Sequence, residues 1–270
     1  PVDIGYGAKL SGRIGEWNVG TLLVNQDEDV QSGIGQRDVF VGRAVLNVLG
    51  ESQIGVIATS GAPQSNLDNT LGGVDFRYRN SNLPGGRTLQ AFAFVQQSDS
   101  EGLAGDDRSW GMGLSYPNNQ GLRGAYVYKQ VGRNFNPGIG FVNQRDLADH
   151  AFDVGYRRFL ARGGYFRSVY GGIDTYRAEY LDDGSVNNQN LGLRLSANNN
   201  SGDNLYLRVI DNREVLRGDF TIYRASDRSR RVVIPAGDYG FAEQVVGLEL
   251  ASQRRISGEI SQRWGDYYDG

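Results

Sequence analysis

The sequence predicts an all-β protein, an antiparallel sheet without helices, and three observations support that fold class. Apolar and polar residues alternate with a period of two in segment after segment, which is the pattern of strands whose two sides meet different surroundings. Helical periodicity is nearly absent. Short, turn-forming segments alternate with longer connections along the chain, as expected for a series of hairpins.

The strands are expected where the alternation is clearest. In the first of these segments Ile4, Tyr6 and Leu10 alternate with Lys9 and Arg13. The segments with the clearest alternation are, in chain order, 4–14, 73–79, 109–116, 152–157, 191–198 and 256–264. Two further segments, 88–97 and 165–176, have strand composition but do not sort into two sides.

The turns are expected between these strands, where Gly, Asn, Ser and Pro supply the backbone angles that hairpins need. The expected tight turns are 14–17, 49–53, 82–87, 116–121, 160–165, 198–203 and 251–255. The expected longer connections are 26–36, 60–70, 97–108, 131–148, 181–190 and 211–240. The repeat of strand, turn, strand and long connection predicts about fourteen strands of roughly ten residues, the length of a tilted membrane-spanning strand.

Alternation alone does not distinguish a soluble sandwich from a membrane barrel, because both produce the same alternating sequence. In the sandwich the apolar side faces the core, whereas in the barrel it faces lipid. Three features favour a barrel: glycines on the polar sides of the strands, mid-strand charges of both signs, and Trp and Tyr near strand ends. No apolar run approaches the ~20 residues that a membrane helix needs. The sequence therefore predicts an antiparallel up-and-down transmembrane β-barrel.

The composition limits the chemistry. The chain of 270 residues has a formal net charge of −3, whereas a nucleic-acid-binding domain usually carries a basic excess, so no nucleic-acid partner is expected. It has no Cys and one His, His150, which excludes thiolate and multi-histidine metal sites. We therefore expect no cofactor and no metal.

Several blocks of sequence resemble one known family in their order and spacing. The blocks are GAKLSGRIGEWNVGTLLV (7–24), RNFNPGIGFVNQRD (133–146), VVIPAGDYGF (232–241) and RRISGEISQRWGDYYDG (254–270). The family is an uncharacterised Gram-negative outer-membrane β-barrel region that follows an N-terminal domain similar to carbohydrate-binding module family 9. The resemblance covers nearly the whole chain and implies that residues 1–270 are a single barrel region. It also implies a periplasmic sugar-binding-like domain upstream and more strands after Gly270.

The charged residues on the polar sides of the strands are the candidate pore-lining residues. Arginine predominates among them, and its planar fork suits carboxylates and sugar hydroxyls. By strand parity the pore-lining set is Lys9, Arg13, Asp75, Arg77, Arg79, Asp153, Arg157, Arg194, Arg208, Glu249, Glu259 and Arg263. The alternative is a structural ladder of ion pairs that stiffens the wall.

The segment 131–148 is too apolar for a freely moving loop, because it contains Phe135, Pro137 and Phe141. We expect it to fold back, either into the barrel as a constriction or over its rim. A packing role and a ligand-gating role both remain open.

Acidic clusters occur at 27–29, 106–107 and 182–183, but none has the spacing of a calcium loop. We expect solvated loop charges or contacts with cation-bridged lipopolysaccharide. Nothing identifies the pair of carboxylates that glycoside hydrolysis needs, so an enzyme is not expected.

These observations predict an outer-membrane barrel for the passage or docking of solutes, in contact with lipid and lipopolysaccharide. The resemblance makes an oligosaccharide one possible solute, and the arginines make a small anionic solute another; partner proteins are unknown. One alternative is a plugged barrel that anchors a periplasmic sugar-binding domain without transport. Another is a soluble β-rich carbohydrate-active enzyme.

Overall fold

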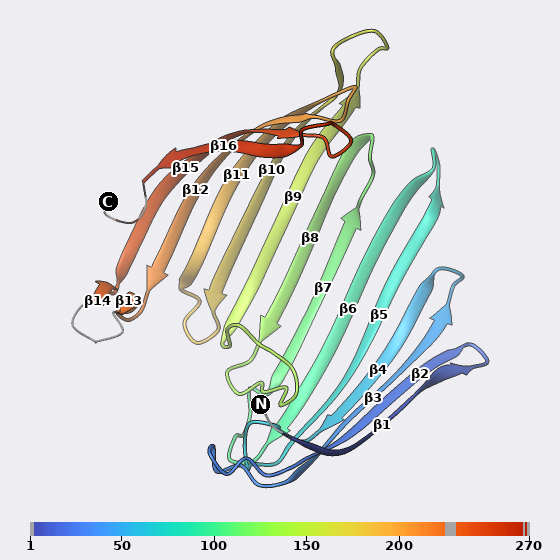
Figure 1. Cartoon of the computed structure of the whole chain (residues 1–270), viewed down its shortest axis with the longest axis vertical. Helices are drawn as coiled ribbons and strands as arrows, with labels where there is room; N and C mark the ends of the chain where they lie inside the picture. Colours follow the sequence, from blue (N-terminus) through green and yellow to red (C-terminus); the bar gives the residue numbers. More distant parts are fainter. Residues whose placement is uncertain (1–2, 225–230, 267, 269–270) are drawn as a thin grey trace. The chain divides into compact units, whose positions relative to one another are not determined.

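The computed structural model describes residues 3–224, 231–266 and 268. Fourteen strands form one antiparallel up-and-down sheet, in which each strand pairs with its neighbours in the order β1 to β12, then β15 and β16 (Figure 1). Two short strands, β13 and β14, form a separate two-stranded sheet. No helix in the described part of the chain has the length and apolar character needed to cross a membrane.

Each expected segment overlaps one strand, and several strands extend four or more residues beyond the segment that predicted them. The strands are β1 (Ile4–Ile14), β2 (Trp17–Gln26), β3 (Arg37–Val48), β4 (Ser52–Ser60), β5 (Asn69–Leu83), β6 (Arg87–Ser100), β7 (Arg108–Tyr116), β8 (Gly121–Val131), β9 (Leu147–Phe159), β10 (Phe166–Tyr180), β11 (Val186–Asn199), β12 (Asn204–Leu216), β13 (Phe220–Arg224), β14 (Arg231–Ile234), β15 (Gly237–Leu250) and β16 (Gly258–Gly265). The prediction of an all-β chain with about fourteen antiparallel strands is confirmed. The edge strands are β1 and β16 and the sheet is not closed, so the barrel stays a prediction.

The chain divides into two compact units, each treated by itself below. The first unit comprises residues 1–115 and 127–148, and the second comprises residues 116–126 and 149–270. In the first unit the turns 15–16, 49–51 and 84–86 lie at one end of the strands. The longer connections 27–36, 61–68, 101–107 and 132–146 lie at the opposite end, because consecutive strands are antiparallel.

The predicted long connections were wrong in two places of the second unit. The connection expected at 181–190 ends at residue 185, where β11 begins. Within the connection expected at 211–240, β12 continues to Leu216, β15 begins at Gly237, and the β13–β14 hairpin lies between them; residues 225–230 lie outside the described residues. Amide side chains concealed the start of β11, and charged residues concealed the end of β12 and the start of β15. The latter pair with each other: Arg213 Nη2 lies 2.7 Å from Asp238 Oδ2.

The strand register separates two faces in the first unit. Directly paired residues point to the same side of a sheet, and successive residues of a strand point to opposite sides. The apolar face is the side of the row Ile14, Trp17, Leu46, Ile54, Phe76, Ala93 and Met112. The polar face is the side of the adjacent row Arg13, Asn18, Val45, Gly55, Asp75, Phe94 and Gly111.

The second unit has the same two faces. Its apolar face is the side of the row Val169, Ala197, Leu205, Leu248 and Ile260. Its polar face is the side of the row Gly172, Arg194, Arg208, Val245 and Arg263. The apolar side chains are strongly exposed in both units: Leu10 is 69% exposed, Leu193 43% and Ile260 78%. No described part of either unit covers its own apolar face.

Candidate functional site

The polar face of the first unit contains all five candidate pore-lining residues that belong to it. Lys9 lies four positions before Arg13 on β1 and therefore on the same side of the strand. Arg77 and Arg79 lie two and four positions after Asp75 on β5 and share its side. Alternation along the strands therefore placed these five side chains together on one face, as the parity argument required.

Ion pairs connect some of these residues to partners that the sequence did not identify. Arg43 Nη1 on β3 lies 2.6 Å from Asp75 Oδ2 on β5, across the glycine Gly55 of β4. Arg79 Nε lies 3.6 Å from Glu51 Oε2 in the turn 49–51. The pairing partners come from strands and turns that are distant in the sequence, so no local pattern could have named them.

On the polar face of the second unit, several arginines form ion pairs with acidic residues of the same face. Arg194 and Arg208 are direct cross-strand neighbours and both approach Asp174, at 3.6 and 3.1 Å. Arg263 Nη1 lies 3.0 Å from Glu243 Oε2. These pairs match the structural-ladder interpretation for this part of the face.

The remaining candidates of the second unit lie on the same face. Glu249 and Glu259 are direct neighbours on β15 and β16, and Glu259 accepts a hydrogen bond from the Tyr206 hydroxyl. Asp153 and Arg157 flank Gly155 on β9, and the Tyr170 ring lies over Gly155 and over Gly172 of the polar row. Every predicted pore-lining residue therefore lies on the polar face of its own unit; that these faces line a pore stays a prediction.

Aromatic rings on the polar face lie over glycines of the neighbouring strands. Phe92 and Phe94 on β6 have nearly parallel rings, 13° apart, with centroids separated by 6.4 Å. Their rings occupy the space that Cβ atoms would need at Gly113 and Gly111 of β7. This packing explains why glycine is frequent on a face that is otherwise polar.

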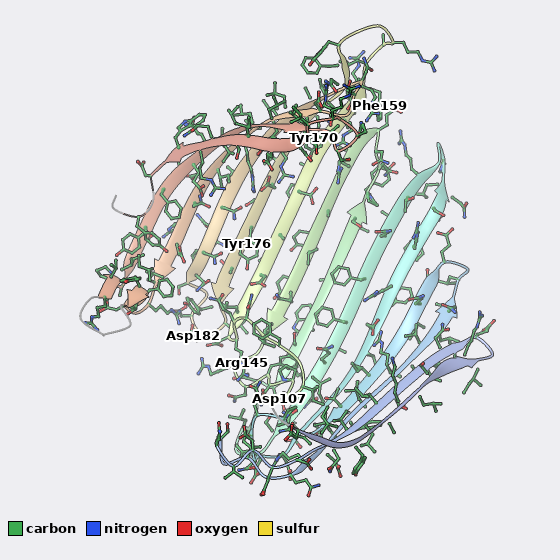
Figure 2. All side chains as sticks on the ribbon, in the orientation of Figure 1. Asp107, Arg145, Phe159, Tyr170, Tyr176 and Asp182 are labelled. Carbon is green, nitrogen blue, oxygen red and sulfur yellow. The ribbon has the colours of Figure 1, made fainter. Side chains whose placement is uncertain are left out.

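Tyr170 is the centre of a cluster that the sequence interpretation missed (Figure 2). The guanidinium carbons of Arg123 and Arg157 lie 5.9 and 5.4 Å from its ring centroid. Arg123 was not among the candidates, because the segment 121–131 was not one of those with clear alternation. Arg123 shares one side of β8 with Ala125 and Val127, and this parity was the one available signal.

The segment 132–146 folds back onto the polar face of the first unit. Phe135 is 3% exposed and packs with Leu71 and Val131, and Val142 joins this cluster from the same segment. Leu71 belongs to the polar side of β5, two positions after Asn69 and four before Asp75. The three predicted segment residues therefore separate: Phe135 is buried, Pro137 is partly buried, and Phe141 is 86% exposed.

Hydrogen bonds fix this folded-back segment. The Asn136 backbone amide donates to Ser98 Oγ at 2.9 Å, and Asn69 Nδ2 donates to the Asn136 carbonyl at 2.9 Å. Arg133 and Asp146 pair at 2.9 Å and close the base of the segment. Figure 2 shows Arg145 and Asp107 in this region of the first unit.

The acidic pair at 182–183 lies in the connection between β10 and β11 and is partly exposed, and it binds an arginine that the sequence did not identify as its partner. Arg217 binds Asp182 at 2.8 Å and Asp183 at 2.6 Å, and its guanidinium carbon lies 3.5 Å from the centroid of Tyr180. The hydrogen bond from Arg217 holds the pKa of Asp182 at about 2. Among the residues described, no group of three or more His, Asp or Glu side chains is arranged to hold a metal ion.

Comparison with known proteins adds no further assignment: no family model, no curated protein and no solved structure matches the chain. The resemblance to an outer-membrane family, and the upstream domain that it implies, therefore stay predictions.

Proposed function

We propose that the chain forms the wall of an outer-membrane β-barrel through which hydrophilic solutes pass. The apolar face contacts lipid, with lipopolysaccharide at the outer leaflet, and the polar face lines a water-filled lumen. The observation that carries this proposal is the exposure of the apolar face along every strand. Soluble monomers rarely expose contiguous apolar patches larger than a few hundred Å².

The position of charge on the apolar face supports lipid as its surroundings. In the first unit, the charged residues of the described strands on this face are Asp38, Arg87, Asp99 and Arg108. Each lies at an end of its strand, Arg87 beside the turn 84–86 and the other three beside long connections. The rest of this face is an uncharged band, which is the form that the lipid-facing belt of an outer-membrane barrel takes.

Intrinsic fluorescence tests this proposal without any substitution. The three tryptophans of the chain, Trp17, Trp110 and Trp264, all lie on the apolar face. In liposomes, lipids brominated on the acyl chains should quench their emission, whereas aqueous iodide should quench it weakly. Strong quenching by iodide with none by brominated lipid would contradict a lipid-facing side.

Passage through a lumen needs a separate measurement. A folded barrel migrates differently on a gel before and after heating, and an open one conducts ions in a planar bilayer. The folded-back segment 132–146 supports a second candidate, a lumen narrowed or plugged so that the barrel serves as an anchor. Heat-modifiable migration without conductance would favour the anchor over the pore.

A further inference from the structure

Two arginines and one tyrosine of the second unit form a compact positive cluster on the polar face. Arg123 comes from β8, Arg157 from β9 and Tyr170 from β10, and all three side chains are partly buried. Both guanidinium groups lie within 6 Å of the same ring. Two like charges are thus held together, and the ring compensates for them only in part, because a cation–π contact is weaker than an ion pair.

This cluster differs from the neighbouring arginines in having no ion-paired acid, although Asp153 lies on the same face two positions before Gly155 and four before Arg157. Arg194, Arg208 and Arg263 each pair with Asp174 or Glu243. In the described part of the chain, neither Arg123 nor Arg157 forms an ion pair. The Nε of Arg157 is also buried without a hydrogen-bond partner. A buried donor on a charged group is costly to leave unpaired, so the cluster lacks an acceptor that carries negative charge.

We infer that Arg123, Arg157 and Tyr170 form a binding site for the sulfate or carboxylate group of an acidic solute. The planar fork of arginine binds such oxyanions through two parallel hydrogen bonds, and two forks can share one anion. Gly155 and Gly172 leave the space that the Tyr170 ring occupies, and a side chain at either position would displace the ring that both arginines contact. The inference deepens the proposed function, since the polar face that holds the cluster is the proposed lining of the lumen.

Calorimetric titration of the folded protein in detergent micelles tests the site. The probes are sodium sulfate, sodium glucuronate and, as a neutral sugar, glucose. We expect saturable binding of both anions and no binding of glucose. In the double variant R123Q/R157Q the affinity for both anions should fall by about tenfold or more, because two charge-assisted donors are lost.

The matched control is R158Q, which removes the same charge from the next residue of β9. Arg158 lies on the opposite side of the strand and is exposed, so its replacement should leave anion affinity unchanged. R157K provides a milder test in case the double variant does not fold, and it should weaken binding because lysine keeps the charge but loses the fork. Anions that bind elsewhere on the protein would bind with an affinity that neither the double variant nor R157K changes. That result, or the absence of saturable binding to the wild type, would overturn the inference.

The outcomes separate this inference from the proposed function. Quenching by brominated lipid without arginine-dependent anion binding would remove the site and leave the membrane proposal intact. Arginine-dependent anion binding without lipid quenching would retain the site and remove its membrane setting.

Discussion

Glycines on the polar face lie where rings from a neighbouring strand need room. Phe94 lies over Gly111 and Phe92 over Gly113 in the first unit, and Tyr206 lies over Gly247 in the second. A ring that covers a glycine replaces the side-chain contacts that glycine cannot make, which offsets the weakness of glycine in a strand. The residue is therefore part of the packing on this face.

Gly111→Ala should destabilise the fold. The added Cβ would lie 2.8 Å from Phe94 Cε1 and 2.8 Å from the Tyr128 carbonyl oxygen, and the backbone oxygen has little freedom to move. We expect a loss of about 1–3 kcal/mol in the free energy of unfolding, measured by urea denaturation in micelles. Gly72→Ala is the control, since nothing lies within 4 Å of a Cβ there. Equal effects of the two substitutions would contradict the packing argument.

The carboxylate of Asp203 should make stability depend on pH. It is 7% exposed, accepts hydrogen bonds from Ala251 N at 3.1 Å and Asn199 Nδ2 at 2.7 Å, and pairs with Arg254. Hydrogen bonding from Arg254 holds its pKa at about 2, below the value of roughly 3.9 in an unfolded chain. Its stabilising contribution is therefore complete above about pH 5 and is lost as the pH falls toward 2.

Asp203→Asn should thus lower the unfolding temperature at pH 7 and flatten its decline between about pH 5 and pH 2.5. Thermal unfolding followed by circular dichroism across this range provides the measurement. Glu28→Gln, at an exposed position of the connection 27–36, should keep the wild-type profile. A wild-type profile in the Asp203 variant would show that this carboxylate does not couple folding to protons.

At this scale the sequence predicted the side of a charged residue but not its partner. Parity along β5 placed Asp75 and Arg77 together, because alternation is a local property. The partner of Asp75 is Arg43, two strands away, and Arg217 reaches Asp182 from another connection. Such pairs depend on register between strands, which no single segment contains.

Strands with aromatic residues on the polar side and aliphatic residues on the other were the hardest elements to interpret from the sequence. On β6, Phe92 and Phe94 occupy the polar face, while Ala93 and Val95 occupy the apolar one. The hydrophobic pattern is therefore continuous and loses its period of two. The register with β5 and β7 resolves the two sides, which explains why 88–97 could be identified as a strand but not oriented. Likewise, Tyr170 and Tyr176 on β10 share the polar side with Asp174.

The folded-back segment 132–146 offers a test at the scale of one element. Phe135→Ala should remove about 3 kcal/mol of packing between the segment and the polar face. The detached segment should then be cut by trypsin at exposed Arg133 and Arg145 roughly a hundredfold faster, in proportion to its open population. Phe141→Ala alters a side chain that is 86% exposed in the same segment and should leave the cleavage rate unchanged. Cleavage that responds equally to both would show that Phe135 does not hold the segment.

The whole molecule depends on the contrast between the two faces, and one strand provides a paired test. Leu193 lies on the apolar face of β11 and Asn190 on the polar face. In a lipid-embedded barrel, Leu193→Lys should cost about 2–4 kcal/mol near the bilayer midplane, whereas Asn190→Lys should cost little. The free energy of unfolding from liposomes gives both values. In a soluble sheet the exposed Leu193 would tolerate lysine, so a neutral result would argue against lipid.

The number and direction of the strands could be predicted from the spacing of turns, because each hairpin is encoded by its own residues. Closure of the sheet could not, since it depends on what the backbone groups of the edge strands β1 and β16 pair with. The β13–β14 hairpin was missed for a related reason: it pairs with neither β12 nor β15 and interrupts their connection without changing the main ladder.

The insertion of the β13–β14 hairpin between β12 and β15 has a consequence for how such a chain can evolve. Strands pair in the order in which they occur along the chain, and β12 pairs directly with β15 although the β13–β14 hairpin lies between them in the sequence. A duplication or loss of two adjacent strands would therefore create only one new junction and would preserve all other ladders. The number of strands is consequently the property that such a duplication or loss can change with least effect on the rest of the sheet, so related chains can differ in strand number while keeping the same hairpins.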